Sequence, residues 1–376
     1  MKKHNKHAKL KLRVNGNFAP NEVAFVGVKC AVILEMVEKI SAELYNKVKI
    51  AYADASHGKD NIAPILDTYT YHSSGDMVIS ADIKKNKFNE HIRYSNYDLV
   101  LVNGNHFPAQ QQIVFLDPEK EASIEKRIDQ LNSVQFFIAT QKELGVFDCL
   151  KKKYPRYNDL PIYAVDDIYA ISKHINSLVE KQRAKLNGLV LIGGKSMRMG
   201  TDKAQLSYYG IPQYEYATKL LEAKGLPTYV SIRANQTIEN YKVIKDAFVG
   251  LGPFGAICSA FMKNPNEAYL VLATDLPYVS DKVIDTLIAH RNPKKIATAI
   301  KAKSSEFMEP LITIWEPKAY PILLSYLAQG YSCPRKILIN SEVEIIEVDD
   351  AIVRNINTPE EFKEVQKELN KINIQK

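Results

Sequence analysis

A glycine pair followed by three cationic side chains is the segment of this sequence best suited to chemistry on phosphates. An apolar stretch ends at Ile192, Gly193-Gly194 follows it directly, and Lys195, Arg198 and Lys203 come shortly after. Glycines permit positive φ angles and let the backbone approach a ligand, and consecutive amide groups in such a turn attract anions. Arginine can hold two phosphate oxygens in a fork, whereas lysine acts as a mobile point charge. The segment therefore predicts a polyphosphate site.

The spacing within this loop excludes the two best-known phosphate-binding motifs. A P-loop requires GxxxxGK followed by Ser or Thr, and a dinucleotide-binding turn requires GxGxxG; the loop provides neither. A glycine pair alone would equally fit an ordinary strand-to-helix turn. The complete string GGxSxRMGxDK over residues 193–203 is much more specific than such a turn.

The string resembles the signature of the molybdenum cofactor guanylyltransferases (MobA type), within the pyrophosphorylase-like nucleotidyltransferases. In that family the glycine loop holds the base and the phosphates of the nucleotide. The resemblance implies that Arg198 and Lys203 are catalytic, because they would hold the triphosphate and stabilise charge as pyrophosphate leaves. The family usually has Ala at the position of Ile192, so we expect added bulk beside the base. Nucleotide contacts are implied for Leu191, Gly193, Gly194, Ser196 and Lys203.

A single carboxylate follows the apolar run 269–273 closely. Asp275 precedes Leu276-Pro277. Open α/β sheets bind ligands at the carboxyl ends of their strands, and Mg²⁺ prefers hard oxygen ligands that it shares with phosphates. Taken alone, an aspartate here would equally fit a turn before proline. The family carries its metal-binding aspartate in a DxP motif at this place, so the resemblance implies that Asp275 is a catalytic residue and the Mg²⁺ ligand.

The segment 252–257, Gly-Pro-Phe-Gly-Ala-Ile, resembles the family's GPLxGI segment, which lies beside the nucleotide and the acceptor. The resemblance implies acceptor contacts for Gly252 and Pro253. Ala256 stands where the family more often has glycine, which argues against a close backbone approach at that position. Asp246, shortly before the segment, matches an aspartate near the ribose, and the alternative is a solvated loop aspartate.

The segment 355–359, Asn-Ile-Asn-Thr-Pro, matches the family's NINTP segment. Asn355 and Asn357 lie two residues apart, hence on one face of an extended chain, and each offers a donor and an acceptor. The resemblance implies that they bind the acceptor or belong to the metal shell, and a turn before the next helix is the alternative for Asn357. Thr358 is a good N-cap and Glu361 can close a capping box, so a helix is predicted to begin here.

Weaker candidates lie in two other segments of the second half. Glu309-Pro310-Leu311 is a candidate pocket wall, and the cations of 331–336 are candidates for meeting a phosphorylated acceptor; surface or packing roles are the alternative for both. Cys258 and Cys333 have no paired histidine, and we expect both to be packing residues.

The composition predicts a soluble, cytoplasmic protein of two domains. A chain of 376 residues exceeds what one hydrophobic core usually supports. Its four cysteines contain no CxxC pair, which argues against a zinc site and a disulfide framework. Neither a membrane span nor a secretory signal is expected. Lysines cluster in the first 13 residues, which could form a nucleic-acid-binding arm or a solvated tail. The lack of aromatic residues there favours the solvated tail. We therefore expect neither nucleic-acid nor membrane partners.

Apolar runs alternate with amphipathic stretches along the chain, which predicts an α/β fold class with two doubly wound domains, residues 1–183 and 184–376. The second is expected to be a Rossmann-like NTP transferase fold. Predicted strands cover 23–28, 48–53, 99–102, 114–116, 134–139 and 162–165, then 188–192, 227–232, 270–273, 296–300, 311–315 and 343–348. Predicted helices cover 31–45, 124–131, 142–154 and 167–181 in the first half.

The first half resembles the molybdopterin-guanine dinucleotide adapter GTPases (MobB type) with a worn P-loop. The run 27–30 keeps one glycine, and no Ser or Thr follows Lys29; residues 97–104 resemble the family's second apolar strand, with Asn103 where a glutamate is common. By this resemblance, the first half lacks both the phosphate-binding loop and the acidic residue of the family. We expect a non-hydrolysing scaffold or docking domain, in which Lys29 and the segment 54–59 could still bind an anion.

Taken together, the motifs predict a Mg²⁺-dependent nucleotidyltransferase of molybdenum cofactor biosynthesis. The resembled reaction transfers GMP from GTP to molybdopterin, and molybdoenzymes or cofactor-insertion proteins are candidate partners. One alternative is CMP transfer to the same cofactor, or transfer by another NTP transferase to a phosphorylated small molecule. The other alternative is a non-catalytic nucleotide-binding cofactor chaperone, which the intact Arg198, Lys203 and Asp275 disfavour.

Overall fold

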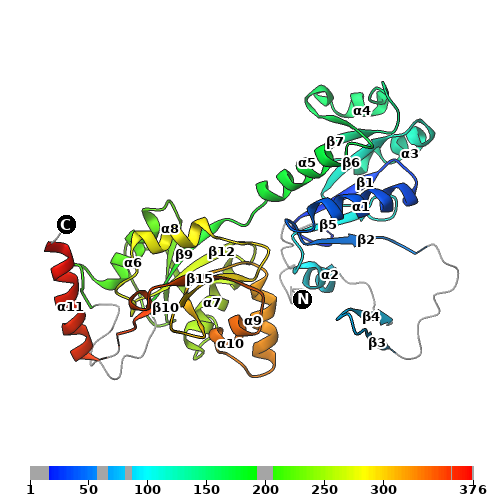
Figure 1. Cartoon of the computed structure of the whole chain (residues 1–376). Coiled ribbons are helices and arrows are strands. Elements are labelled where there is room, and N and C mark those ends of the chain that lie inside the picture. Colours follow the sequence, from blue (N-terminus) through cyan, green and yellow to red (C-terminus); the bar gives the residue numbers. More distant parts are fainter. Residues whose placement is uncertain (1–16, 57–66, 81–86, 193–205, 357, 375–376) are drawn as a thin grey trace, which may run out of the picture. The chain divides into compact units, whose positions relative to one another are not determined.

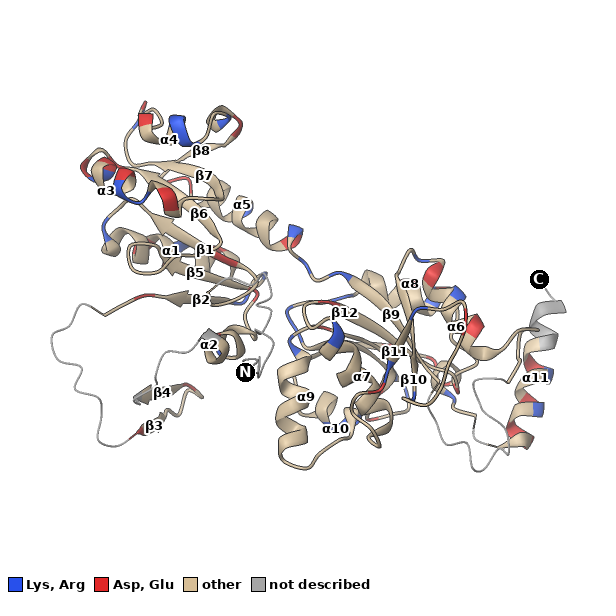
Figure 2. Ribbon diagram, turned by 180° about the vertical axis from the view of Figure 1, so that it is seen from behind, with Lys and Arg blue, Asp and Glu red and all other residues tan. Residues whose placement is uncertain are grey.

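Two α/β units, Met1–Gln182 and Arg183–Lys376, make up the chain (Figure 1). The computed structural model describes residues 17–56, 67–80, 87–192, 206–356 and 358–374. Figure 2 shows the strands of both units mostly free of charged residues, which lie mainly on helices and loops. Strands that are covered on both faces by helices need apolar side chains on both faces, and this explains their continuous apolar runs.

The first unit is built on a parallel sheet with the strand order β2-β5-β1-β6-β7-β8. The first strand lies in the interior of the sheet and the later strands extend it on both sides, as in doubly wound folds. The strands are β1 Glu22–Val26, β2 Ile50–Ala53, β5 Leu99–Asn103, β6 Gln111–Leu116, β7 Val134–Ala139 and β8 Ile162–Ala164.

Helices cover both faces of this sheet. Helices α1 (Cys30–Leu44) and α5 (Ile168–Lys181) pack on one face, where their apolar side chains meet Phe25 and its neighbours. Helices α3 (Glu121–Lys126) and α4 (Asp148–Lys153) contribute to the core on the opposite face. Alternate residues of each strand point to opposite faces, which is why one apolar run supplies both cores.

Several predicted elements of the first half differ from the structure. The helix predicted over 142–154 is wrong in its first half, because only Asp148–Lys153 is helical and Glu143 has a left-handed φ of 61°. The helix predicted over 124–131 begins earlier and ends at Lys126, before a 3₁₀ turn. Helix α2 (Lys87–Tyr94) and the hairpin of β3 (Thr68–Tyr71) and β4 (Met77–Ser80) were not predicted.

The second unit has a mixed sheet of the order β11-β10-β9-β12-β14-β13-β15. Strand β14 runs antiparallel to both of its neighbours, and the remaining pairs are parallel. The strands are β9 Leu186–Leu191, β10 Thr228–Ile232, β11 Val243–Lys245, β12 Ala268–Ala273, β13 Ala297–Ala302, β14 Met308–Trp315 and β15 Val343–Val348.

Helices again cover both faces of the sheet. Helices α6 (Gln213–Glu222) and α8 (Asp281–Ala289) pack on one face. Helices α7 (Gly252–Lys263), α9 (Ala319–Ala328) and α10 (Pro334–Ile339) pack on the other. Each strand predicted in this half has a counterpart, and β11 is the strand that the sequence did not reveal.

The last helix, α11 (Pro359–Ile374), begins as the capping box predicts. The Thr358 backbone N–H donates to Glu361 Oε2 at 3.1 Å, and the Glu361 N–H donates to Thr358 Oγ1 at 3.2 Å. This reciprocal pair satisfies two of the amide donors that a helix start leaves open. No helix in the described part of the chain has the length and apolar character needed to cross a bilayer.

Candidate functional site

The carboxyl ends of four neighbouring parallel strands meet at one edge of the second sheet. In the order β11, β10, β9 and β12 these strands end at Lys245, Ile232, Leu191 and Ala273. Ligands of open α/β sheets bind outside such edges. In the sequence the glycine-rich string begins two residues after β9, an interior strand of the sheet, and the string itself lies outside the described residues.

Asp275 connects three of the predicted motifs. It lies two residues beyond β12, and its backbone carbonyl accepts a hydrogen bond from the Ile356 N–H at 3.1 Å. Its neighbour Thr274 donates from Oγ1 to the carbonyl of Leu191 at 3.4 Å. The end of β9, the DxP motif and the segment with Asn355 therefore lie together, although more than 150 residues separate the first from the last. Asn355 is exposed, whereas Ile356 is buried.

Asp246 stands at the far side of the same edge. Its N–H donates to the Ile232 carbonyl at 2.9 Å, and its Oδ1 accepts from the Ser231 hydroxyl at 2.9 Å. Burial raises the pKa of this carboxyl, and the Ser231 hydrogen bond and the charge of Arg233 only partly oppose that shift. Three spacings of about 4.8 Å separate β11 from β12, which leaves room between the two aspartates for a nucleotide.

A second carboxylate lies beside Asp275. Glu309 is the second residue of β14, which runs antiparallel to β12, and the residue is 8% exposed. Burial raises the pKa of Glu309; Arg335 opposes this through an Nη2–Oε2 contact of 2.9 Å, while the charge of Asp275 raises the pKa further. Two carboxylates close enough to influence each other's charge offer oxygen donors of the kind that a hard divalent cation prefers.

The donor set is small. No cluster of three or more His, Cys, Asp or Glu side chains able to hold a metal occurs among the described residues.

Tyr208 belongs to this site and carries no recognisable sequence signal. It is 3% exposed, and its hydroxyl makes no hydrogen bond with any described residue. Burial raises the pKa of Tyr208, and the negative charge of Asp275 raises it further. The ring packs edge-on against Phe362 in a small core that also contains Ile356. Tyr208 therefore links helix α11 to the carboxylate edge.

Ile192 and Ala256 were expected to hinder the approach of the ligand, but both lie in the core instead. Ile192 was expected to add bulk beside the base, but it is 4% exposed and packs in the core under α6 and α8. Ala256 is buried in the core on the α7 face. The exposed part of that segment is Gly252-Pro253 at the start of α7, where Gly252 has a φ of 56°.

Other predicted residues are placed differently or lie beyond the described ranges. Cys258 packs in the core as expected, but Cys333 is exposed, because it precedes the short helix α10 at the surface. The predicted site residues that lie outside the described ranges are Gly193, Gly194, Lys195, Ser196, Arg198, Lys203 and Asn357, together with residues 57–59 of the candidate anion segment. Leu191 ends β9 at the edge and is 8% exposed.

Comparison with known proteins assigns the second unit. Residues 188–344 match the family of the MobA-like NTP transferase domain. The second unit carries a MobA-like NTP transferase domain. A molybdenum cofactor biosynthesis bifunctional protein of Synechocystis sp. is 32% identical over 218 residues, which cover 53% of this chain and 63% of that protein. A molybdenum cofactor guanylyltransferase of Vibrio atlanticus is 28% identical over 46% of this chain and 92% of its own length.

Among solved structures, the molybdopterin-guanine dinucleotide biosynthesis protein A of Archaeoglobus fulgidus aligns with a TM-score of 0.43 and 22% identity over 49% of this chain and 99% of its own. The glycine string, Asp246, the 252–257 segment and Asp275 all lie within the residues that match the MobA-like domain. The MobB-like character of the first unit stays a prediction.

Proposed function

We propose that this chain transfers GMP from GTP to molybdopterin in molybdenum cofactor biosynthesis. The observation that carries the proposal is the hydrogen bond from Ile356 to Asp275, which brings the NINTP segment to the DxP aspartate at the end of β12. These two segments and the glycine string resemble the signature of one family, and relatives of this chain include proteins named molybdenum cofactor guanylyltransferase.

In the proposed reaction a terminal phosphate oxygen of the acceptor attacks the α-phosphorus of GTP. A new P–O bond forms to the acceptor, the bond to the β-phosphate breaks, and pyrophosphate leaves with the electron pair. Such a transfer depends on positioning and charge neutralisation more than on proton transfer. Lys203 and Arg198 would hold the triphosphate, and Asp246 would orient the ribose.

Asp275 would hold Mg²⁺, with Glu309 as the neighbouring carboxylate. When bound, the ion would neutralise phosphate charge as pyrophosphate leaves. Arg335 opposes the rise in the pKa of Glu309 that burial causes. Asn355 and Gly252-Pro253 are exposed and would meet the acceptor.

Substitution of Asp275 tests the site assignment. Asp275→Asn and Lys203→Ala should each lower GMP transfer by about 100-fold or more, because each removes charge stabilisation that matters most in the transition state. The matched control is Asp285→Asn on α8, whose carboxylate is exposed and pairs with Lys224. Pyrophosphate release with GTP, Mg²⁺ and molybdopterin provides the measurement, and thermal unfolding checks that each variant is folded. Retained turnover in both site variants would overturn the assignment.

A nucleotide-binding assay tests which base the site prefers. Because Ile192 and Ala256 are both packed in the core, neither change argues against guanine at the edge. Thermal shifts with Mg²⁺ and each of GTP, CTP, ATP and UTP should therefore be largest for GTP. A larger shift with CTP would favour CMP transfer to the same cofactor.

A further inference from the structure

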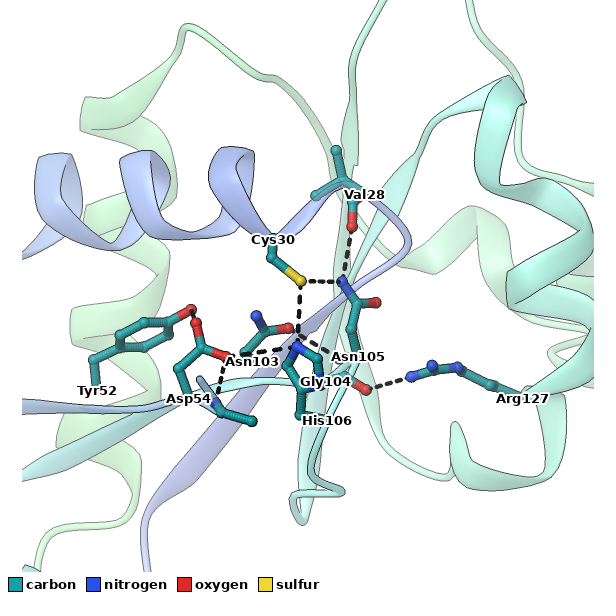
Figure 3. Close-up of polar contacts among 10 residues, drawn as sticks. Val28, Cys30, Tyr52, Asp54, Asn103, Gly104, Asn105, His106 and Arg127 are labelled. Atoms are coloured by element: carbon teal, nitrogen blue, oxygen red, sulfur yellow. Dashed lines mark hydrogen bonds and ion pairs between the residues drawn. The ribbon is translucent and has the colours of Figure 1, made fainter. Parts of the chain in front are cut away.

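A thiol, an imidazole and a carboxylate converge in the first unit, at the loop where a phosphate loop would lie. Cys30 is the first residue of α1, Asp54 follows β2, and His106 lies in the loop after β5. Strands β2, β5 and β1 are neighbours, so these three positions meet at one edge. His106 Nε2 lies 3.3 Å from Cys30 Sγ and 3.8 Å from Asp54 Oδ1 (Figure 3).

The backbone around the thiol and the imidazole is fixed by close packing. Gly27 has a φ of 94°, and a Cβ there would lie 2.7 Å from a backbone oxygen of β6. A Cβ at Gly104 would lie 2.7 Å from a backbone oxygen of β1. Asn105 Nδ2 ties the two loops together, because it donates to the Val28 carbonyl at 2.9 Å and lies 3.5 Å from Cys30 Sγ.

The carboxylate is held in its ionised form. Asp54 Oδ2 accepts from the Tyr52 hydroxyl at 2.8 Å, and Oδ1 accepts from the Ala55 N–H at 2.7 Å. Burial opposes ionisation, but these hydrogen bonds, with contributions from Asn103 and His106, outweigh it and lower the pKa of Asp54. Burial raises the pKa of Tyr52, and its hydrogen bond to Asp54 and the charges of Asp54 and Cys30 add to the shift.

The geometry distinguishes two uses of the histidine. A proton relay uses both ring nitrogens, one toward the nucleophile and one toward the carboxylate. Here a single nitrogen, Nε2, faces both the sulfur and the carboxylate oxygen. An imidazolium placed between two anions stabilises a thiolate, and the first turn of a 15-residue helix adds positive potential at the same sulfur.

We propose that Cys30 is a nucleophilic thiolate site that takes a soft, uncharged electrophile, specifically a small disulfide. A phosphate would meet both the Asp54 carboxylate and the thiolate, so an anionic ligand is disfavoured. A neutral disulfide needs only an exposed, ionised sulfur and space beside it. His106 and Asp54 side chains are 20% and 29% exposed and Cys30 is half-buried, so the cluster lies partly open to solvent.

The side-chain amide of Asn103 gives a second, independent indication that a ligand binds at this place. Asn103 is fully buried, and its Oδ1 accepts from the Asn105 N–H at 3.1 Å. Its Nδ2 has no hydrogen-bond partner among the described residues, although it lies near enough to Asp54 to favour the ionised carboxyl. Figure 3 shows this amide among Tyr52, Asp54 and Cys30. A buried donor without a partner is uncommon in folded proteins, and a bound acceptor would satisfy it.

The chemical step is thiol–disulfide exchange. The Cys30 thiolate attacks one sulfur of the disulfide, a new S–S bond forms, and the old S–S bond breaks. The second sulfur leaves as a thiolate and takes a proton from solvent. The product is a mixed disulfide on Cys30, and the external disulfide is the oxidant. His106 acts as a positioning residue that stabilises the attacking charge.

The test measures the rate at each cysteine of the full chain with a neutral dipyridyl disulfide, with the modified peptides quantified by mass spectrometry. Cys149 is the internal control, because it is also half-buried near a helix start, but burial and the charges of Glu121 and Glu125 raise its pKa. At neutral pH, Cys30 should react about tenfold or more faster than Cys149 and than the exposed Cys333.

Two substitutions of His106 separate reactivity from accessibility. His106→Phe and His106→Gln should each slow Cys30 by about tenfold and steepen its rise in rate between about pH 6 and 8, because the thiolate loses its cationic partner. The rate at Cys149 should stay the same in both variants, which shows that the first unit is folded. A Cys30 rate no higher than that of Cys333, or a rate that both variants leave unchanged while Cys149 is also unchanged, would overturn the proposal.

Discussion

The two units place very different side chains at equivalent edges of similar sheets. In the second unit Asp246 and Asp275 stand just beyond the ends of β11 and β12, and the glycine string comes two residues after β9 in the sequence. In the first unit the loop after β1 leads into Cys30, whose sulfur contacts His106, and His106 in turn lies beside Asp54. The frame in both is a set of parallel strands covered by helices. The comparison shows that the α/β frame fixes where a ligand can lie, while a few loop residues decide which chemistry occurs there.

The units also differ in how they use buried carboxylates. Glu22 in the first unit is 1% exposed and accepts only backbone N–H groups, so its role is to hold a turn. Glu309 in the second unit lies beside Asp275 and pairs with Arg335 at the ligand edge. A buried carboxylate satisfied by backbone donors serves the fold, whereas one beside a second carboxylate favours a cation.

The larger of two expected effects on stability comes from removing the charge of Glu22, which should destabilise the first unit alone. Its Oε1 accepts from Asn17 and Gln110 at 2.9 Å each, and its Oε2 accepts from Phe18 at 2.8 Å. Glu22→Gln turns an amide NH₂ toward these donors and should lower the free energy of unfolding of the first unit by about 2–4 kcal/mol. Chemical denaturation followed by hydrogen exchange of each unit measures this.

The matched control is Glu35→Gln on α1, an exposed carboxylate paired with Lys39, which should change stability by less than about 0.5 kcal/mol. Nucleotide transfer should survive Glu22→Gln, because the second unit has its own core. If nucleotide transfer disappeared when the first unit unfolds, this would contradict the assignment of all nucleotide chemistry to the second unit.

A smaller, pH-dependent effect is expected at Asp246. Its pKa is raised above the ordinary 3.8, mainly by burial. The stabilisation is fully present below the ordinary pKa, where the carboxyl is protonated in both states, and is lost as pH rises through the folded-state pKa. The melting temperature of the second unit should thus fall by about 1–2 °C more in the native chain than in Asp246→Asn as pH rises from about 4 to 7. Parallel thermal melts decide the point, and identical pH profiles would contradict the burial argument.

Local patterns made much of the second site predictable. The capping box of Thr358 and Glu361 needs only residues three apart, and both of its hydrogen bonds form. Asp275 was placed at the edge from an apolar run followed by a carboxylate. The antiparallel direction of β14 was not predictable, because a strand buried on both faces has the same apolar pattern in either direction.

Contacts between distant residues were the part that the sequence could not reveal. Cys30 and His106 lie 76 residues apart and meet only because β5 lies beside β1. Glu309 and Arg335 gave weak signals singly, since their pairing depends on the placement of α10 against β14. Tyr208 gave no signal in the sequence. Its hydroxyl has no hydrogen-bond partner among the described residues, and the sequence cannot distinguish such a tyrosine from an ordinary core tyrosine.

The most direct test of the central claim follows the α-phosphate of the nucleotide. The full chain is incubated with Mg²⁺, molybdopterin and GTP labelled at the α-phosphorus, and the products are separated. We expect the label to move to a molybdopterin dinucleotide in step with pyrophosphate release, and we expect Asp275→Asn to abolish both. Label that stays in GTP or GMP, with a folded and GTP-binding chain, would contradict it.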